Sequence, residues 1–139
     1  MLAVTQRGHG DSGKPDGEYE SRVFARDVAS FMDTLLIERA VIVGHSMGST
    51  VAQRFAVDHP QRVRALVLAG AFFPRPANTE VRKFLEEVST PSDPIDPAFV
   101  RDFQKSTLVQ PVPPEFFDTV VGEAMKVPAR VWRAALHRN

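Results

Sequence analysis

The sequence predicts an α/β fold in which three parallel strands with flanking helices are followed by a helical lid. A short β-branched run at residues 40–43 leads into a glycine-flanked turn and then into apolar residues at helical spacing. A similar apolar run fills residues 64–70, and a helical pattern at residues 22–36 precedes both runs. Because strands that alternate with helices pair in parallel through right-handed crossovers, these observations indicate a parallel sheet.

The first 36 residues are expected to form a strand, a loop and a helix. Residues 1–5 have the length and apolar character of a buried strand. Three glycines, an Asp-Ser pair and a proline make residues 6–15 a loop. Ser21 can cap the helix predicted at residues 22–36. The apolar face of that helix is expected to consist of Phe24, Val28, Phe31 and Leu35.

The rest of the chain is expected to contain one strand followed by short helices. Pro60 ends the helix after the central turn because proline cannot continue it, and residues 64–70 form a third buried strand. After Phe73 prolines recur between apolar residues at helical spacing. Helices are expected to start near Asn78 or Thr79, at Pro97 behind an Asp96 cap, at Pro114 and at Pro128. We therefore divide the chain into a sheet core at residues 1–73 and a helical lid at residues 74–139.

The turn at residues 44–48, Gly-His-Ser-Met-Gly, has the pattern of a nucleophile elbow. Ser46 at its apex is expected to have a strained backbone that lifts its hydroxyl clear of the sheet. Gly44 and Gly48 are expected to flank it because a Cβ at either position would collide as strand and helix close together. The following helix directs its free amides to the same point, so the Met47 amide can donate to an oxyanion.

Three stretches of the sequence together resemble the α/β-hydrolase superfamily, in its serine-nucleophile branch. Arg7-Gly8-His9-Gly10-Asp11-Ser12 resembles the loop after the family's fourth strand. Gly44-His45-Ser46-Met47-Gly48 resembles the elbow after its fifth strand. His59-Pro60-Gln61-Arg62-Val63, with residues 65–70, resembles the lead into its sixth strand. The family often has aspartate two residues before the loop arginine, where this chain has Thr5.

The resemblance implies a partial α/β-hydrolase fold. In the family, three strands precede the first of these stretches, the acid follows strand seven and the histidine follows strand eight. We therefore expect this chain to be an internal fragment that lacks the first three and the last two strands. Strand three lies between strands four and five in the family sheet. Residues 1–5 are consequently expected to be weakly held, because unpaired strand groups cost free energy.

The resemblance also implies roles for the elbow residues. Ser46 would be the nucleophile, Met47 would supply an oxyanion amide, and His45 would lie buried beneath the site. Serine at the apex argues against the haloalkane dehalogenase and epoxide hydrolase branches, which carry aspartate there. Esterases, enol-lactonases, carbon–carbon bond hydrolases and cofactor-free haloperoxidases remain. The apolar lid favours a small, largely apolar acyl substrate, and no cofactor is implied.

The sequence assigns neither the catalytic base nor the acid. His45 neighbours the nucleophile, but adjacent side chains diverge at such a turn, and geometry takes precedence over residue type. The other histidines, which are better explained by structural or surface roles, are His9, His59 and His137. The candidate acids, which are better explained by cap or surface roles, are Asp93, Asp96, Asp102 and Asp118.

Composition argues against several other classes of protein. The 139 residues carry 17 basic and 17 acidic side chains, so nothing suggests a nucleic-acid partner or an anionic membrane. The absence of cysteine excludes disulfides, thiolate metal sites and cysteine nucleophiles, and it is consistent with a cytoplasmic location. The four histidines lack the i, i+4 spacing of a metal site, and the apolar runs are too short for a membrane span.

Two functional hypotheses follow. In the first, the parent protein is a serine hydrolase that cleaves a carboxylic ester, lactone or similar compound through an acyl-enzyme on Ser46. The isolated chain would be inactive, because a serine without histidine and acid is a poor nucleophile. In the second, the chain is a non-catalytic fragment, or a ligand-binding or signalling protein on the same fold. Both hypotheses leave open whether a second chain completes the fold or the chain forms an oligomer.

Overall fold

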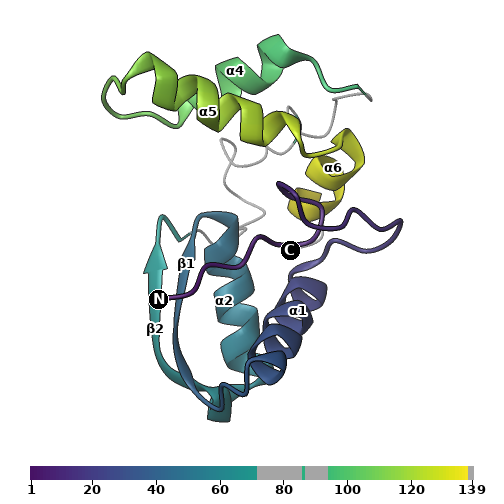
Figure 1. Ribbon diagram of the computed structural model, residues 1–139, viewed down its shortest axis with the longest axis vertical. Helices are drawn as coiled ribbons and strands as arrows, with labels where there is room; N and C mark the ends of the chain where they lie inside the picture. The colour runs from purple at the N-terminus through teal and green to yellow at the C-terminus, as the bar shows by residue number, and fades with distance from the viewer. Residues whose placement is uncertain (72–85, 87–93, 138–139) are drawn as a thin grey trace.

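The computed structural model describes residues 1–71, 86 and 94–137 (Figure 1). In chain order the elements are α1 (Ser21–Thr34), β1 (Ala40–His45), α2 (Met47–Asp58), the 3₁₀ helix η1 (Pro60–Arg62), β2 (Val63–Ala69), α4 (Pro97–Ser106), α5 (Pro114–Met125) and α6 (Ala129–His137). Figure 1 shows a body made of the sheet, α1 and α2, with α4 and α5 beyond it and α6 between the two groups. Within these ranges, no helix combines the length and apolar character that crossing a bilayer requires.

The sheet of the described residues consists of β1 and β2, which pair in parallel. The register sets Ile42 opposite Leu66 and Val43 opposite Val67. Helix α2 connects the two strands and packs, together with α1, against the sheet. The predicted α/β class and the parallel helical crossover are therefore confirmed.

Residues 1–5 do not form the strand predicted at the start of the chain. They are irregular and exposed, and neither strand of the described sheet pairs with them. A strand is stabilised by a ladder of hydrogen bonds to a neighbour, and the described sheet offers no such ladder here. The prediction of three parallel strands was therefore wrong at residues 1–5, and the weak hold expected on this segment stays a prediction.

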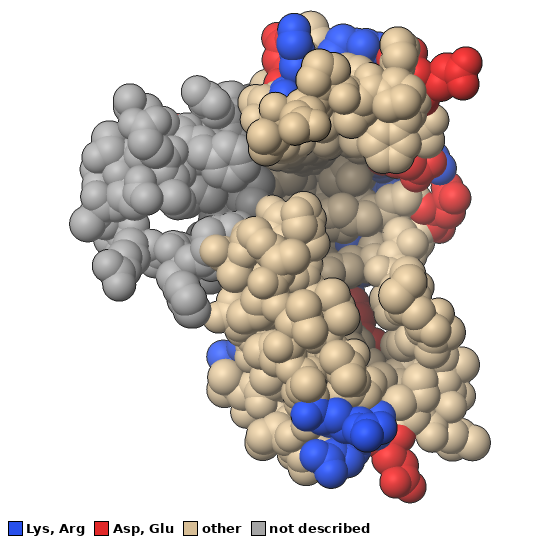
Figure 2. Space-filling model, turned by 90° about the vertical axis from the view of Figure 1, so that its left-hand side faces the viewer, with Lys and Arg blue, Asp and Glu red and all other residues tan. Residues whose placement is uncertain are grey.

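The strands are also less buried than predicted. Val41, Val43 and Val67 are 53%, 68% and 48% exposed, and the register places all three on the face opposite Ile42. Of the strand residues, Ala40, Ile42 and Val63 pack against the cluster formed by α1 and α2. Figure 2 looks onto the β2 side of the molecule and shows a face with few charged side chains. Parallel sheets are usually covered on both faces, whereas the described residues cover only one face of this sheet.

Two apolar clusters hold the body together. In the first, Met32 of α1 and Phe55 of α2 pack over Ile42 and Val63 of the sheet. The second cluster joins α1 and α2 to the segment around α6, and its buried members are Tyr19, Phe24, Val51, Val127 and Val131. The body and α6 therefore share one core.

A third apolar cluster lies between α4 and α5, where Val100 and Val121 are buried. Trp132 of α6 packs against this cluster and against the cluster that contains Val51. Its ring meets Phe103 edge to face, with centroids 5.0 Å apart. The helices predicted to start at Pro97 and Pro114 are confirmed, and α6 starts directly after Pro128. The helix expected near residue 78 lies outside the described residues, apart from Glu86, which is helical.

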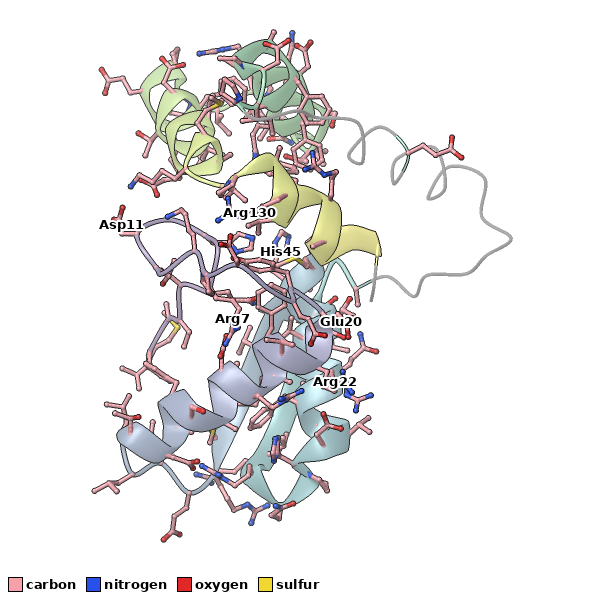
Figure 3. The ribbon with its side chains drawn as sticks, turned by 90° about the vertical axis from the view of Figure 1, so that its right-hand side faces the viewer. Arg7, Asp11, Glu20, Arg22, His45 and Arg130 are labelled. Carbon is pink, nitrogen blue, oxygen red and sulfur yellow. The ribbon has the colours of Figure 1, made fainter. Side chains whose placement is uncertain are left out.

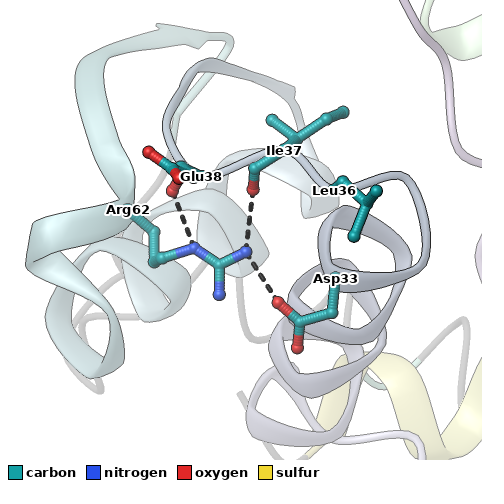
Figure 4. Close-up of a pocket in the computed structure, with 5 residues that line it drawn as sticks. All are labelled: Asp33, Leu36, Ile37, Glu38 and Arg62. Atoms are coloured by element: carbon teal, nitrogen blue, oxygen red, sulfur yellow. Dashed lines mark hydrogen bonds and ion pairs between the residues drawn. The ribbon is translucent and has the colours of Figure 1, made fainter.

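Helix α1 starts and ends differently from the prediction. Its N-cap is Glu20, so Ser21 is its first residue and not its cap. It ends at Thr34 because Leu36 adopts a left-handed backbone with φ 55°. Arg62 then holds the turn by donating to the carbonyls of Ile37 and Glu38, at 2.9 and 2.8 Å. A hollow of about 430 Å³ beside this turn is lined by Asp33, Leu36, Ile37, Glu38 and Arg62 (Figure 4).

Truncation of Phe55 should test the first cluster. Phe55 is completely buried, so the Phe55→Ala variant is expected to lose about 3–5 kcal/mol of unfolding free energy. Val57 on the same helix is 72% exposed, and Val57→Ala should change it by less than about 0.5 kcal/mol. Urea denaturation followed by circular dichroism measures both. Similar losses in the two variants would contradict the packing described here.

Candidate active site

Ser46 lies at the junction between β1 and α2, where the chain reverses direction. Its backbone has φ 51° and ψ −121°, which is a left-handed conformation for a non-glycine residue. Its side chain is exposed. The strand, sharp turn and helix predicted around Ser46 are therefore present, together with the expected backbone strain.

Hydrogen bonds hold the Ser46 backbone on both sides of its α-carbon. Its amide donates to the carbonyl of Ala69 at the end of β2, at 2.9 Å. Its carbonyl accepts from the amide of Ser49 at 2.8 Å and from the Ser49 hydroxyl at 2.6 Å. The bend is therefore tied to β2 through one bond and to α2 through two.

The two glycines of the motif have different surroundings. A Cβ on Gly44 would lie 2.2 Å from the carbonyl oxygen of Gly48 and 2.8 Å from the α-carbon of Ser49. Gly44 is therefore required for the close approach of strand and helix, as predicted. A Cβ on Gly48 would meet no described atom within 4 Å. The collision predicted at Gly48 was wrong, because it is the Gly48 backbone, and not its missing side chain, that approaches β1.

The Met47 amide opens helix α2 directly after Ser46. The first amides of a helix lack acceptors within the helix, and no described residue accepts a hydrogen bond from this one. The helix dipole adds positive potential at the same end. An amide in this position can stabilise an oxyanion that forms on a carbonyl carbon beside the Ser46 hydroxyl.

His45 is exposed at the end of β1, and not buried beneath the site as expected. Figure 3 shows it at the end of the sheet that lies toward α6. Its ring lies over Gly70, where an added Cβ would stand 3.6 Å from Nε2. This side of the sheet is not covered by α1 and α2, which explains the exposure. Among the described residues, no imidazole hydrogen-bonds to the Ser46 hydroxyl.

The other described histidines have structural contacts. Nδ1 of His9 lies 2.9 Å from the carbonyl oxygen of Arg7, and its ring meets Phe24 edge to face. His59 packs on Phe55, with ring centroids 5.1 Å apart. The side chain of His137 lies outside the described residues. The structural roles predicted for His9 and His59 are therefore confirmed.

The candidate acids that the structure describes have cap or surface positions. Asp96 accepts a hydrogen bond from the Ala98 amide at 2.8 Å, which confirms the predicted cap of α4. Asp118 pairs with Arg101 at 2.7 Å, and Asp102 is exposed. Asp93 lies outside the described residues. Over the described ranges, no three His, Cys, Asp or Glu side chains are grouped so that they could hold a metal ion.

The loop at residues 6–16 packs against α1 and α6 through contacts that the sequence did not reveal. A Cβ on Gly8 would lie 2.7 Å from both Tyr19 and Val131, so this glycine permits close packing of the loop against α6. Arg7 Nη2 donates to Asp27 of α1 at 2.6 Å, and this bond raises the pKa of Arg7. The loop is therefore bound both to the body and to α6.

Two basic side chains near the start of α6 contact the same loop. Lys126 pairs with Asp11 at 3.0 Å and with Glu123 at 2.9 Å, and Arg130 donates to the carbonyl of Lys14 at 2.9 Å. Figure 3 shows Arg130 on the side of α6 that faces the loop carrying Asp11. The hydrogen bond from Lys126 lowers the pKa of Asp11. The hydrogen bonds to Glu123 and to Asp11 raise the pKa of Lys126.

A family model described as alpha/beta hydrolase fold matches residues 2–138 of the chain. The chain is 42% identical over 66 residues to 2-(acetamidomethylene)succinate hydrolase of Mesorhizobium japonicum, covering 48% of this chain and 24% of that protein. It is 35% identical over 101 residues to 2-hydroxymuconate semialdehyde hydrolase of Pseudomonas sp. strain CF600, covering 62% and 36%. It is 34% identical over 83 residues to bifunctional epoxide hydrolase 2 of Sus scrofa, covering 58% and 15%.

Solved structures of similar shape agree with this match. An esterase from Exiguobacterium antarcticum superposes with a TM-score of 0.79 at 21% identity, covering 98% of this chain and 54% of that chain. A thermophilic esterase from Thermogutta terrifontis superposes with a TM-score of 0.76 at 26% identity, covering 96% and 52%. The chain thus spans about half of each solved structure. It spans 15% to 36% of the curated relatives named above.

Substitution of the two motif glycines should separate their roles. Gly44→Ala is expected to cost about 3 kcal/mol or more of unfolding free energy, because the added Cβ meets backbone at 2.2 Å. Gly48→Ala should leave stability unchanged or raise it by up to about 1 kcal/mol, since alanine favours a helix where space is open. Thermal denaturation of the two variants makes the comparison. Equal destabilisation by the two substitutions would contradict the different surroundings of Gly44 and Gly48.

Removal of the Lys126 charge should change the titration of Asp11. Because Lys126 lowers the pKa of Asp11, their pair stabilises the fold above the unfolded pKa of aspartate and loses its effect as pH falls through the lowered pKa. Lys126→Met should therefore raise the Asp11 pKa toward its ordinary value, measured by NMR titration of the carboxyl carbon. Lys14→Met, the control, should raise it less, because Lys14 makes the smaller contribution. An unaltered Asp11 pKa in Lys126→Met would exclude the contact.

Proposed function

Because this chain belongs to the alpha/beta hydrolase fold family, we propose that the protein is a serine hydrolase whose nucleophile is Ser46. The proposed substrate is a carboxylic ester, lactone or similar acyl compound. The Ser46 oxygen attacks the carbonyl carbon, the alcohol leaves, and water then releases the acid from the acyl-enzyme. The observation that carries the proposal is the left-handed bend that exposes Ser46 at the amino end of α2.

The proposed role of Met47 is to donate its amide to the oxygen that becomes negative during attack. Removal of one such donor typically slows acyl transfer by about 10²–10³-fold. The direction of the Met47 N–H bond therefore affects the rate of the proposed reaction. The proton of Ser46 must pass to a base, and we propose a histidine for this role. No described side chain hydrogen-bonds to the Ser46 hydroxyl in the manner of such a base. The proposal is supported by the family and by the geometry of the elbow.

Serine at the apex favours acyl transfer over epoxide opening, although one relative is a bifunctional epoxide hydrolase. Attack of a serine hydroxyl on an epoxide would give an ether, which water does not readily cleave. Attack on an ester or lactone gives an acyl-serine ester, which water hydrolyses to regenerate the hydroxyl. Ser46 therefore suits a substrate with a carbonyl or related acyl group.

The surroundings of Met47 favour a small, largely apolar acyl group. Its side chain packs against the buried cluster that contains Val51 and Val131, and Trp132 of α6 packs against the same cluster. Met47 itself is only partly buried, so an acyl chain bound beside Ser46 would meet its side chain. The proposed reaction requires no cofactor, nucleic acid or membrane, and we propose a cytoplasmic location.

A second candidate is a non-catalytic role, either in ligand binding or as one part of an assembly. The observation that favours it is the Ser46 hydroxyl, which has no histidine partner among the described residues. The exposed face that contains Val43 and Val67 is consistent with a second copy or a complementing chain. Both candidates use the same fold, and they differ in whether Ser46 reacts.

Covalent labelling with an alkyl fluorophosphonate should test the proposed nucleophile. Because the phosphonyl adduct on a serine does not turn over, even slow attack by Ser46 beside the Met47 amide accumulates as label. Ser46 is therefore expected to be labelled selectively, with Ser106, an exposed serine of α4, as the internal reference in peptide mass spectrometry. The Ser46→Ala variant should stay unlabelled. Labelling spread over several serines, or equal in Ser46→Ala, would favour the non-catalytic candidate.

Ester turnover provides a second readout on the same variants. The 139-residue chain is expected to hydrolyse short p-nitrophenyl esters no faster than Ser46→Ala, because no described histidine accepts the Ser46 proton. A burst of p-nitrophenol that depends on Ser46 would contradict this expectation. It would also show that the chain supplies its own base.

A further inference from the structure

Ser49 contacts the elbow through a side chain that the proposed reaction does not use. It is completely buried, although it is a polar residue. Its hydroxyl donates to the Ser46 carbonyl at 2.6 Å, and its amide donates to the same oxygen at 2.8 Å. Ser49 therefore fixes the position of the Ser46 carbonyl oxygen with two donors.

The Ser46 carbonyl and the Met47 amide belong to one peptide group. Such a group is planar, and in its trans form the C=O and N–H bonds point in opposite directions. A hold on the carbonyl oxygen therefore also sets the direction of the Met47 N–H. The ψ of −121° at Ser46 orients this plane relative to the Ser46 side chain.

We propose that Ser49 is a positioning residue that aims the Met47 amide at the oxyanion site. This inference rests on the oxyanion role of Met47 in the proposed function. The Ser49 hydroxyl acts on the amide through the carbonyl of the same peptide and touches no substrate. Without it, the amide of Ser49 alone would hold the carbonyl, and the first peptide of α2 would move more freely.

An ordinary helix contact does not account for this arrangement. Serine hydroxyls in helices often bond to a carbonyl three residues earlier, as Ser106 does to Phe103 at 2.7 Å. Ser106 is exposed, and the contact lies at the end of α4. Ser49, in contrast, is fully buried, and its acceptor is the strained residue of the turn. The Ser49 contact therefore acts on the peptide group that carries the Met47 amide.

The test compares wild type with Ser49→Ala and Ser49→Cys, and uses Thr50→Val as the matched control. The Thr50 hydroxyl is buried one residue further along α2 and has no partner among the described residues. The first readout is the ¹⁵N order parameter of the Met47 amide, which does not depend on activity. It should be about 0.85 in wild type and Thr50→Val, and fall toward about 0.6 in Ser49→Ala.

The second readout is the rate of fluorophosphonate labelling at Ser46. Loss of one hydrogen bond should slow the labelling step of Ser49→Ala by about three- to tenfold, with little change in the affinity for the probe. Ser49→Cys keeps a weak donor and should lie between alanine and wild type. Thr50→Val should label at the wild-type rate. This pattern would support a positioning role over a merely structural one.

Several outcomes would overturn the inference. One is an unchanged Met47 order parameter in folded Ser49→Ala, and another is an unchanged labelling rate in that variant. If Ser49→Ala does not fold, wild-type values of both readouts in Ser49→Cys would overturn it instead. Absence of Ser46 labelling in wild type would refute the proposed function. The order parameter would then decide alone whether Ser49 holds the amide.

Discussion

The bend at Ser46 is the constraint on which the rest of the site depends. A left-handed backbone at a non-glycine residue costs about 1–3 kcal/mol and persists only where its surroundings hold it. Here the Ala69 carbonyl binds the amide of Ser46, and Ser49 binds its carbonyl. Gly44 allows α2 to approach β1 closely enough for these bonds to form. As a result Ser46 is exposed beside the Met47 amide, from which no described residue accepts a hydrogen bond.

The same geometry connects the elbow to the helical part of the chain. Met47 follows the bend directly, and its side chain packs on a cluster that includes Val131 of α6. Gly8 lets the preceding loop pack against that helix, and Lys126 adds an ion pair to Asp11 at its edge. The loop, the elbow and α6 therefore form one structural unit, in which apolar packing is supplemented by exposed charges of modest energetic weight.

Local chemistry explains which features the sequence could predict. The end of α2 before Pro60, the Asp96 cap of α4 and the turn at Gly44–Ser46 were predictable. Each of these features depends on neighbouring residues alone. Residues 1–5 failed as a strand because pairing requires a partner that the described sheet lacks. The exposure of Val43 and the burial of Ser49 also depend on distant packing, so no local pattern signals them.

The backbone conformation of Ser46 in solution tests this account most directly. Proton NMR distinguishes the two possible states, since a positive φ brings the amide and α protons of one residue close together. We expect a strong nuclear Overhauser effect between these two protons of Ser46, consistent with its φ of 51°. A weak effect with a coupling constant typical of a regular helix, whose φ is about −63°, would contradict the account.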